Sequence, residues 1–237
     1  MTNDPKDGDG LLLLIDKPKN YSSARVVNII KKKLNIRKAG HSGTLDPLAS
    51  GLMIVCTGKK TKMLNSMLNF DKEYLGIMVL GETTKSFDLE TEVITGKPLG
   101  NLDAQVINEN AKAFTGEIEQ IPPMYSAVKH QGKPLYKYAR KKIEVERKPR
   151  KVIIKEFRVK DISLPEVTFR VVCSKGTYIR TLVNDFGEKL GTGAYLKELR
   201  RIRIGDYGVK DAMQLDDFLD KPDLRNFEHR MKKKNNL

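Results

Sequence analysis

The spacing of apolar residues along the chain predicts both strands and helices. Short apolar runs predict strands at 11–15 (LLLLI), 52–56 (LMIVC), 74–80 (YLGIMVL), 152–159 (VIIKEFRV) and 167–173 (VTFRVVC). In the last of these, apolar and polar residues alternate, which is typical of a strand with one buried face. The expected strands are spread along the chain, so much of the core should be β-sheet.

An apolar period near 3.6 residues predicts helices between these strands. One helix begins after a cap at Ser22 or Ser23, with an apolar face made of Val26, Val27, Ile30 and Leu34. A second is expected at 102–114. A third begins after a Thr177 cap and ends at Gly191, with the apolar stripe Ile179, Leu182, Val183, Phe186 and Leu190. Because strands and helices interleave irregularly, the pattern favours the α+β class with a mixed sheet over a doubly wound fold.

The charge of the chain points to a class of partner. Its 237 residues include 44 Lys and Arg against 30 Asp and Glu, a net charge of +14. A protein this basic usually binds a polyanion, and nucleic acid is the leading candidate. A generally basic proteome or a basic tail is the alternative explanation.

Positive charge gathers at 129–160, which holds 13 Lys and Arg against Glu144, Glu146 and Glu156, a balance of 13 − 3 = +10. Three tyrosines lie within or just before this segment: Tyr125, Tyr136 and Tyr138. Basic residues with exposed aromatic rings suit looped RNA, because the charges meet phosphates and the rings stack on unpaired bases. The alternative is a solvated helix face with the tyrosines in the core.

Common patterns for metal and triad chemistry are absent from the sequence. It has no P-loop, no GxSxG and no HExxH, and only three histidines. Cys56 and Cys173 are far apart and are expected to be buried free thiols in a reducing compartment. There is no signal peptide, and the run at 11–15 is too short to span a membrane, so we expect a cytoplasmic protein without membrane contact.

The segment AGHSGTLDPLASGLMIV (39–55) places one carboxylate, Asp46, in a turn-rich loop directly before an apolar strand. Two interpretations are open from these residues. Asp46 could cap a short helix with Pro47 as its first residue. It could instead act as a nucleophile or base in a closed site, which requires a nearby cation or donor hydrogen bonds. Arg180, in the first turn of the third expected helix, is a candidate for that cation.

Six segments in order resemble the motifs of the TruB-type tRNA pseudouridine synthases: LLLLIDKPKNYSSARVV, HSGTLDPLASGLMIVCTGKKTK, DKEYLGIMVLG, IPPMYSAVKHQGKPLYKYAR, SKGTYIRTLVNDFGEKLG and LRRIRIGDYG. GTLDP alone would be modest evidence, but the ordered set is highly specific. The resemblance implies the pseudouridine synthase fold, with a central, largely antiparallel mixed sheet flanked by helices and loops. It places a catalytic domain at 10–210. The polar residues 1–9 are expected to be disordered, and residues 211–237 to form a short charged extension.

The resemblance also implies the site residues. Asp46 matches the catalytic Asp of the family. Tyr74 matches the tyrosine that stacks on the target base, and Arg180 the arginine that pairs with the catalytic Asp. Leu199 matches the leucine that lines the uracil pocket, and His41 the histidine that fills the space left by the flipped base. Tyr178, in the same GTYIR motif as Arg180, is included among the substrate-binding residues. Taken without the resemblance, Tyr74 and Leu199 could be core residues and His41 a loop residue.

The implied reaction converts one T-loop uridine of tRNA, uridine 55 in tRNA convention, to pseudouridine. The base is flipped into the pocket, its N1–C1′ bond breaks, and it rejoins through C5. Asp46 would attack the sugar C1′, attack the base, or remove a sugar proton, and the sequence does not choose among these routes. Nothing is consumed, so no cofactor or metal is expected, and the protein should act on the tRNA T-stem-loop as a monomer without a protein partner.

Two departures from the family pattern are visible. About thirty residues follow GDYG, too few for the small C-terminal RNA-binding domain of many bacterial members, so we expect that full domain to be lacking. GETTKSFDLETEVI differs from the more usual TDT-type loop. The other interpretations are the guide-RNA-dependent relative of archaea and eukaryotes, a catalytically idle RNA-binding or chaperone protein on the same fold, and a synthase that modifies another structured RNA.

Overall fold

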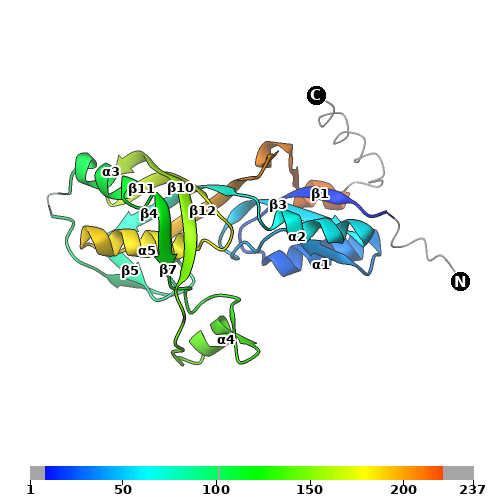
Figure 1. Ribbon diagram of the computed structural model, residues 1–237, viewed down its shortest axis with the longest axis horizontal. Coiled ribbons are helices and arrows are strands. Elements are labelled where there is room, and N and C mark those ends of the chain that lie inside the picture. Colours follow the sequence, from blue (N-terminus) through cyan, green and yellow to red (C-terminus); the bar gives the residue numbers. More distant parts are fainter. Residues whose placement is uncertain (1–8, 101, 221–237) are drawn as a thin grey trace, which may run out of the picture. The chain divides into compact units, whose positions relative to one another are not determined.

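The computed structural model describes residues 9–100 and 102–220 and divides the chain into two compact units (Figure 1). Unit 1 is made of the chain up to Phe70 and from Arg200 onward, and unit 2 is made of Asp71–Leu199. The catalytic domain expected at 10–210 includes parts of both units and stays a prediction. Residues 1–8 of the expected disordered segment and 221–237 of the expected extension lie outside the described residues.

Unit 1 contains a mixed sheet in the order β14–β1–β3–β12, with β2 on β3 and β13 on β12. β1 pairs antiparallel with β3, whereas β1 with β14 and β3 with β12 are parallel. The elements are β1 (Leu12–Lys17), α1 (Ser23–Leu34), β2 (Ala39–His41), β3 (Ser50–Thr57), the 3₁₀ helix η2 (Gly58–Met63), α2 (Leu64–Met67), β12 (Ala194–Ile204), β13 (Tyr207–Gly208), the 3₁₀ helix η3 (Val209–Asp211), β14 (Met213–Gln214) and α6 (Leu215–Asp220).

The core of unit 1 lies against β1 and β3, whose residues are almost all buried. One cluster of buried residues consists of Leu14, Leu52, Ile54, Cys56, Met67 and Ile204. Helix α1 buries Val26, Val27 and Ile30, as its period predicts. Ser22 caps it by accepting a hydrogen bond from the Arg25 amide, and the chain leaves α1 through Asn35 at a φ of 51°. Both ends of α1 are therefore satisfied locally.

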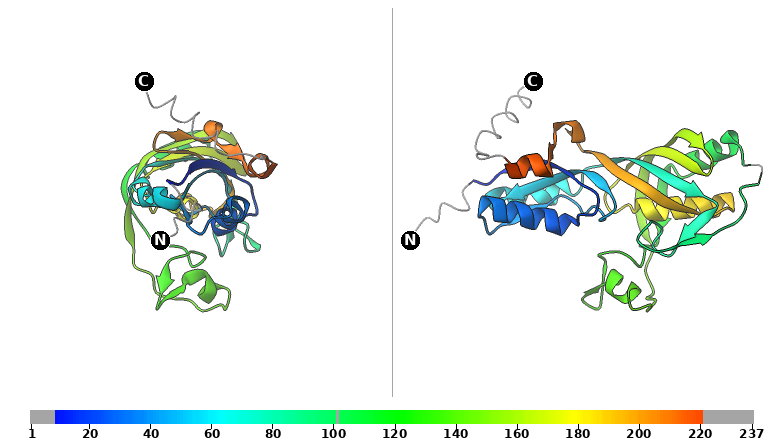
Figure 2. Two further views of the ribbon diagram at one scale, coloured as in Figure 1. Left: turned by 90° about the vertical axis from the view of Figure 1, so that its right-hand side faces the viewer. Right: turned by 180° about the vertical axis from the view of Figure 1, so that it is seen from behind.

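Unit 2 contains strands in the order β12–β4–β11–β10–β7, where β12 contributes its residues up to Leu199. The pairing from β4 to β7 is antiparallel. Figure 2 shows these strands and the helices of the same unit from two further sides. The elements are β4 (Lys72–Leu80), β5 (Glu82–Thr84), β6 (Val93–Thr95), α3 (Ala104–Lys112), β7 (Gly116–Gln120), β8 (Lys129–His130), β9 (Lys133–Pro134), α4 (Leu135–Ala139), β10 (Arg150–Ser163), β11 (Glu166–Cys173) and α5 (Ile179–Leu190).

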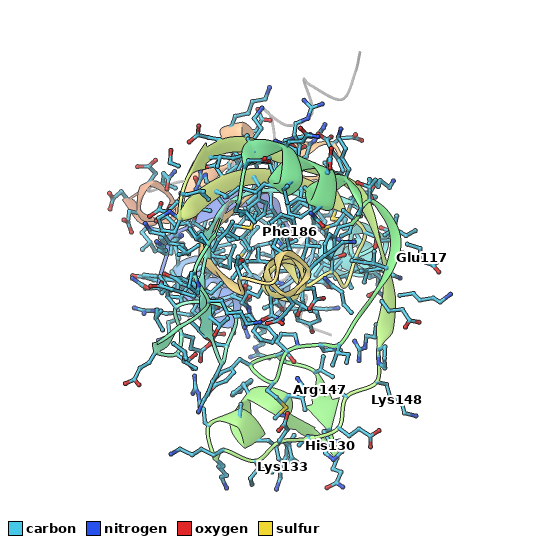
Figure 3. The ribbon with its side chains drawn as sticks, turned by 90° about the vertical axis from the view of Figure 1, so that its left-hand side faces the viewer. Glu117, His130, Lys133, Arg147, Lys148 and Phe186 are labelled. Atoms are coloured by element: carbon cyan, nitrogen blue, oxygen red, sulfur yellow. The ribbon has the colours of Figure 1, made fainter. Side chains whose placement is uncertain are left out.

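Four phenylalanines pack helix α5 against the strands of unit 2. Phe186 of α5 meets Phe157 of β10 and Phe114 edge-to-face, with ring centroids 5.4 and 5.9 Å apart, and Phe157 meets Phe169 of β11 at 5.5 Å. Figure 3 looks along α5 and shows Phe186 directed into the packed interior. Such aromatic pairs add to the stabilisation from apolar burial, so they hold α5 and the residues at its start in place.

Residues 121–149 form a lobe between two neighbouring strands, and we call this segment the lobe (Figure 1). The chain leaves β7 at Gln120 and returns at Arg150, and these two residues are paired in the β7–β10 register. The lobe contains the hairpin β8–β9 and the short helix α4. Both ends of the lobe are therefore fixed at the same edge of the sheet.

The α+β class with a mixed sheet is confirmed, and each expected strand overlaps an observed strand, although the one expected at 11–15 begins at Leu12. The predicted Thr177 cap is wrong: helix α5 begins at Ile179 with Tyr178 at the cap position, and the Thr177 hydroxyl donates instead to the Ser174 carbonyl at 3.0 Å. The local turn satisfies this hydroxyl before the helix starts. Gly191 ends the helix at a φ of 76°, as predicted. The expected loop after β4 contains a short hairpin, β5–β6.

Candidate active site

Asp46 lies in the loop that joins β2 to β3 in unit 1. The two strands pair antiparallel, with His41 opposite Val55. Within the loop the Ala49 amide donates to the Asp46 carbonyl at 3.1 Å, which closes a turn around Pro47. No helix follows Asp46, so the cap interpretation is wrong, because β3 begins at Ser50 and leaves no length for one. The side chain of Asp46 is half-buried.

The Ser23 hydroxyl holds the residue before Asp46. Its oxygen accepts a hydrogen bond from the Leu45 amide at 2.8 Å and donates to the Leu45 carbonyl at 3.0 Å. Both Ser23 and Leu45 are buried, with 2% and 3% of their surfaces exposed. One side chain at the start of α1 thus satisfies both backbone groups of a buried loop residue, which fixes the backbone next to Asp46.

Lys17 holds the residue after Asp46. Its ammonium group donates to the carbonyls of Pro18 at 2.9 Å, Tyr21 at 2.7 Å and Pro47 at 3.3 Å, and the residue is fully buried. Burial lowers the pKa of Lys17 to about 8, the attraction of Asp46 opposes that shift, and the charge of Arg201 reinforces it. The loop around Asp46 is therefore held on both sides and lies in the field of a buried cation.

Arg201 ties the same loop to strand β12. Its guanidinium donates to the Leu52 carbonyl at 2.7 Å and to the Gly43 carbonyl at 3.1 Å, with 1% of the residue exposed. Opposite it in the β3–β12 register is Gly51, at a φ of 105°. A Cβ on Gly51 would lie 2.3 Å from the Arg201 carbonyl oxygen, so only glycine allows the backbones to approach this closely.

His41 stands at the start of the loop. Its Nδ1 accepts a hydrogen bond from the Gly43 amide at 3.2 Å. Burial, and next the charge of Arg201, lower the pKa of His41 below its ordinary value. The imidazole is therefore neutral at pH 7, which agrees with a nitrogen that accepts a hydrogen bond.

Arg180 lies in unit 2, at the second position of α5, with 2% of its surface exposed. Its guanidinium donates to the carbonyls of Ser86 at 3.0 Å and Tyr125 at 2.8 Å, and its Nε lies 3.5 Å from a carboxylate oxygen of Asp88. Asp88 is also buried, with 5% exposed. One carboxylate and two carbonyls therefore hold the Arg180 guanidinium in one orientation before any substrate binds.

The loop that carries Asp88 is held by its own hydroxyl groups. Thr84 and Ser86 both donate to the Asp88 carbonyl, at 2.6 and 2.9 Å. Phe87, between Ser86 and Asp88, adopts a φ of 65°, which costs free energy for a bulky residue. This conformation presents the Ser86 carbonyl and the Asp88 carboxylate to Arg180 together, so backbone strain and the ion pair occur at the same place.

The remaining predicted residues of unit 2 lie on three elements. Tyr74 is in β4 and is 8% exposed, and Leu199 is in β12, the next strand of the sheet, and is 9% exposed. Tyr178 precedes α5. The Gln120 side chain accepts from the Tyr178 amide at 3.0 Å and donates to its carbonyl at 3.2 Å. The end of β7 therefore fixes the start of α5.

The structure thus groups the predicted residues by unit. His41 and Asp46 belong to one loop of unit 1, and Tyr178 and Arg180 to the start of α5 in unit 2. The pairing of Asp46 with Arg180 stays a prediction. Five side chains that hold these residues were missed from the sequence: Lys17, Ser23, Asp88, Gln120 and Arg201. Lys17 and Ser23 stand in the quoted segment LLLLIDKPKNYSSARVV, Arg201 in LRRIRIGDYG and Asp88 in GETTKSFDLETEVI, but nothing in these segments shows which backbone groups the side chains bind.

Two further searches cover the residues that the structure describes. Residues 9–100 and 102–220 contain no group of three or more His, Cys, Asp or Glu side chains that could hold a metal ion. In the same residues no helix is long and apolar enough to cross a membrane. Cys56 and Cys173 are both buried free thiols, as expected.

The α+β fold with its mixed central sheet is that of the pseudouridine synthase class. Two family descriptions match the sequence: the TruB family pseudouridylate synthase N-terminal domain at residues 31–179, and the tRNA pseudouridylate synthase B C-terminal domain at residues 180–229. The chain belongs to the TruB family of pseudouridylate synthases.

Individual relatives agree with this assignment. The tRNA pseudouridine synthase B of Flavobacterium johnsoniae is 47% identical over 214 residues, which cover 87% of this chain and 93% of that protein. The protein of the same name from Phocaeicola vulgatus is 45% identical over 216 residues, which cover 89% and 92%. Among solved structures, a chain of a Cbf5–Nop10–Gar1 complex matches with a TM-score of 0.68 at 32% identity. That match covers 94% of this chain and 56% of the other.

Proposed function

We propose that this chain isomerises one uridine in the T-loop of tRNA, uridine 55 in tRNA convention, to pseudouridine. The observation that carries the proposal is Asp46 in its clamped loop, in a chain that belongs to the TruB family and is similar along most of its length to proteins named tRNA pseudouridine synthase B. The net charge of +14 suits a polyanionic substrate.

Asp46 is the proposed catalytic residue. The Ser23 and Lys17 contacts keep its backbone in place while the carboxylate acts on the flipped nucleotide. The carboxylate attacks C1′, attacks the base, or removes a sugar proton. In each case the N1–C1′ bond breaks and a C5–C1′ bond forms, while the C5 proton leaves, N1 takes up a proton and any sugar proton removed is returned. The product is therefore an isomer of the substrate, and no second substrate is needed.

The other site residues bind the nucleotide in this proposal. Tyr74 stacks on the flipped base, Leu199 lines the uracil pocket, and Tyr178 contributes to binding. Arg180, charged and held by Asp88, pairs with Asp46. His41 is neutral and fills the space that the base leaves. We further propose that the protein acts as a cytoplasmic monomer without a partner protein. The chain is 47% identical to a tRNA pseudouridine synthase B and 32% identical to a chain of the Cbf5–Nop10–Gar1 complex. This difference favours action without a partner protein over the guide-RNA-dependent form.

The test is conversion of a T-stem-loop RNA by the purified protein, with pseudouridine located by carbodiimide labelling and primer extension. The wild type should convert the T-loop uridine, and Asp46→Asn should abolish conversion while RNA binding stays measurable. Undiminished conversion by Asp46→Asn would remove Asp46 from the catalytic role. Tight binding without conversion by the wild type would favour the idle RNA-binding protein, and conversion of another structured RNA in place of tRNA would reassign the substrate.

A further inference from the structure

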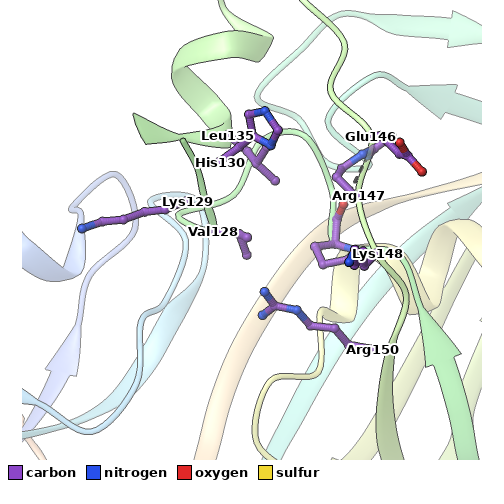
Figure 4. Close-up of a pocket in the computed structure, with 9 residues that line it drawn as sticks. Val128, Lys129, His130, Leu135, Glu146, Arg147, Lys148 and Arg150 are labelled. Carbon is purple, nitrogen blue, oxygen red and sulfur yellow. Dashed lines mark hydrogen bonds between the residues drawn. The ribbon is translucent and has the colours of Figure 1, made fainter. Parts of the chain in front are cut away.

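The lobe of unit 2 has an open pocket at its base. The pocket has a volume of about 390 Å³ and is lined by Pro122, Val128, Lys129, His130, Leu135, Glu146, Arg147, Lys148 and Arg150 (Figure 4). One wall comes from the chain that enters the lobe and the other from the chain that returns to β10. Pockets of about 300–1,000 Å³ hold small ligands, so this one has room for a single nucleotide.

Arg147 fixes the two walls to one another. Its guanidinium donates to the carbonyls of Val145 at 3.1 Å and Pro122 at 3.2 Å, across the base of the lobe. Leu135, at the start of α4, is 1% exposed and closes the apolar side of the pocket. The pocket is therefore formed by structure that is already in place, which limits the entropy lost on binding.

The charge of the lining is strongly positive. Four Lys and Arg line the pocket against one carboxylate, Glu146, and Figure 4 shows Glu146 directed away from the pocket. Arg150 points across it toward Val128 in the same view. Among the residues that the structure describes, the side chains of Lys148 and Arg150 form no ion pair with a carboxylate. A guanidinium in this setting favours a phosphate, which it can bind through two parallel hydrogen bonds.

We propose that this pocket binds one nucleotide of the substrate RNA outside the target base, with its backbone phosphate on Arg150 and its sugar against Pro122 and Val128. The inference rests on the proposed function. A continuous polyanion fits better than a free nucleotide because exposed cations continue over the lobe beyond the pocket, at Lys133, Lys137, Arg140, Lys141 and Lys142. The half-buried Tyr136 and Tyr138 pack within the lobe, as ring contacts to Arg140 and His130 show.

The first test compares two neighbouring cations of β10. Arg150→Ala removes the pocket cation. Lys151→Ala removes the same charge from the next position, which faces the other side of the strand and pairs with Glu117 at 2.8 Å. Binding of a labelled T-stem-loop RNA is measured from 50 to 300 mM salt. Arg150→Ala should lower the affinity about tenfold and reduce the slope of log K against log salt by about 1, while Lys151→Ala should stay within about twofold of the wild type.

The second test locates the phosphate. A series of stem-loops carries one neutral methylphosphonate each. At the contacted position the neutral linkage should weaken binding by the wild type and have no further effect on Arg150→Ala, because the contact is already lost. Equal losses for Arg150→Ala and Lys151→Ala, or additive losses at every position, would overturn the inference. So would saturable binding of uridine 5′-monophosphate that requires Arg150 and leaves RNA affinity unchanged, since it would assign the pocket to a free nucleotide.

Failure of this inference and failure of the proposed function are separable. If the wild type converts the T-loop uridine but Arg150→Ala binds RNA like its control, only the pocket assignment is wrong. If the wild type converts no uridine, the proposed function is wrong whatever the binding data show. Circular dichroism at equal protein concentration checks that both variants remain folded.

Discussion

Replacing Ser23 with alanine should loosen the loop that carries Asp46 while leaving the rest of unit 1 assembled. The hydroxyl makes two hydrogen bonds to Leu45, at 2.8 and 3.0 Å, and both residues are at least 97% buried. Alanine cannot replace either bond, and the site has little access to water. The Leu45 amide and carbonyl would therefore be buried without partners.

The expected loss of stability follows from these two groups. A buried polar group left without a partner costs about 1–3 kcal/mol, so the two groups together should make Ser23→Ala lower the free energy of unfolding by about 2–6 kcal/mol. The neighbouring Ser22→Ala is the matched control. Ser22 is exposed and caps α1 through the Arg25 amide, and loss of such a cap costs about 1 kcal/mol.

Urea unfolding followed by far-ultraviolet circular dichroism measures both losses, since the chain has no tryptophan. Single-turnover conversion of the T-stem-loop is then measured at a temperature where both variants are folded. Ser23→Ala should slow conversion about ten- to a hundredfold, because displacement of a catalytic group by about 1 Å can cost that much. Its RNA affinity should change less than twofold, and Ser22→Ala should convert at the wild-type rate.

The reasoning would be refuted if Ser23→Ala unfolded at the same urea concentration as Ser22→Ala and converted RNA at the wild-type rate. That result would mean that the two hydrogen bonds do not hold the Asp46 loop. A large loss of stability with an unchanged rate would separate the two parts: Ser23 would stabilise unit 1 without positioning Asp46.

Two further predictions concern the buried charges. Asp88→Asn should lower the melting temperature and slow conversion, because the buried Arg180 loses its carboxylate partner. Breaking such a pair costs about 3–5 kcal/mol. The control Glu90→Gln affects only an exposed pair with Arg140, so it should change the melting temperature and the rate of conversion little. Lys17 should make stability depend on pH. Its pKa is about 8 when folded and 10.5 when unfolded, so the unfolded state binds more protons between these values and stability rises with pH in that window. From pH 8 to 10.5 the unfolding free energy of the wild type should therefore rise by about 3 kcal/mol relative to that of Lys17→Met. Urea titrations measure this difference, and a difference that does not change with pH would contradict the burial of the Lys17 amine.

Local patterns were sufficient to predict the strands β1, β3, β4, β10 and β11 and the helices α1, α3 and α5, but not the shorter strands or β12. The alternation at 167–173 became β11, and the stripe from Ile179 to Leu190 became α5 with Gly191 at its end. The Thr177 cap failed because a hydroxyl has several backbone partners within reach, and the turn before α5 supplied one first. Asp46 as a helix cap failed because an Asp-Pro step also suits a turn, and local sequence does not distinguish the two.

The sequence by itself determined the fold class, the family resemblance and the identity of Asp46 as the candidate acid, because side-chain periods and ordered motifs are local or linear properties. Only the tertiary structure decided what holds the site. Ser23 reaches Leu45 across 22 positions, Lys17 reaches Pro47 across 30, and Arg201 reaches Leu52 across 149. Each is a polar side chain that is stable inside the protein only where backbone groups satisfy it. Which groups those are depends on how distant segments meet, and no periodic pattern in the chain carries that information.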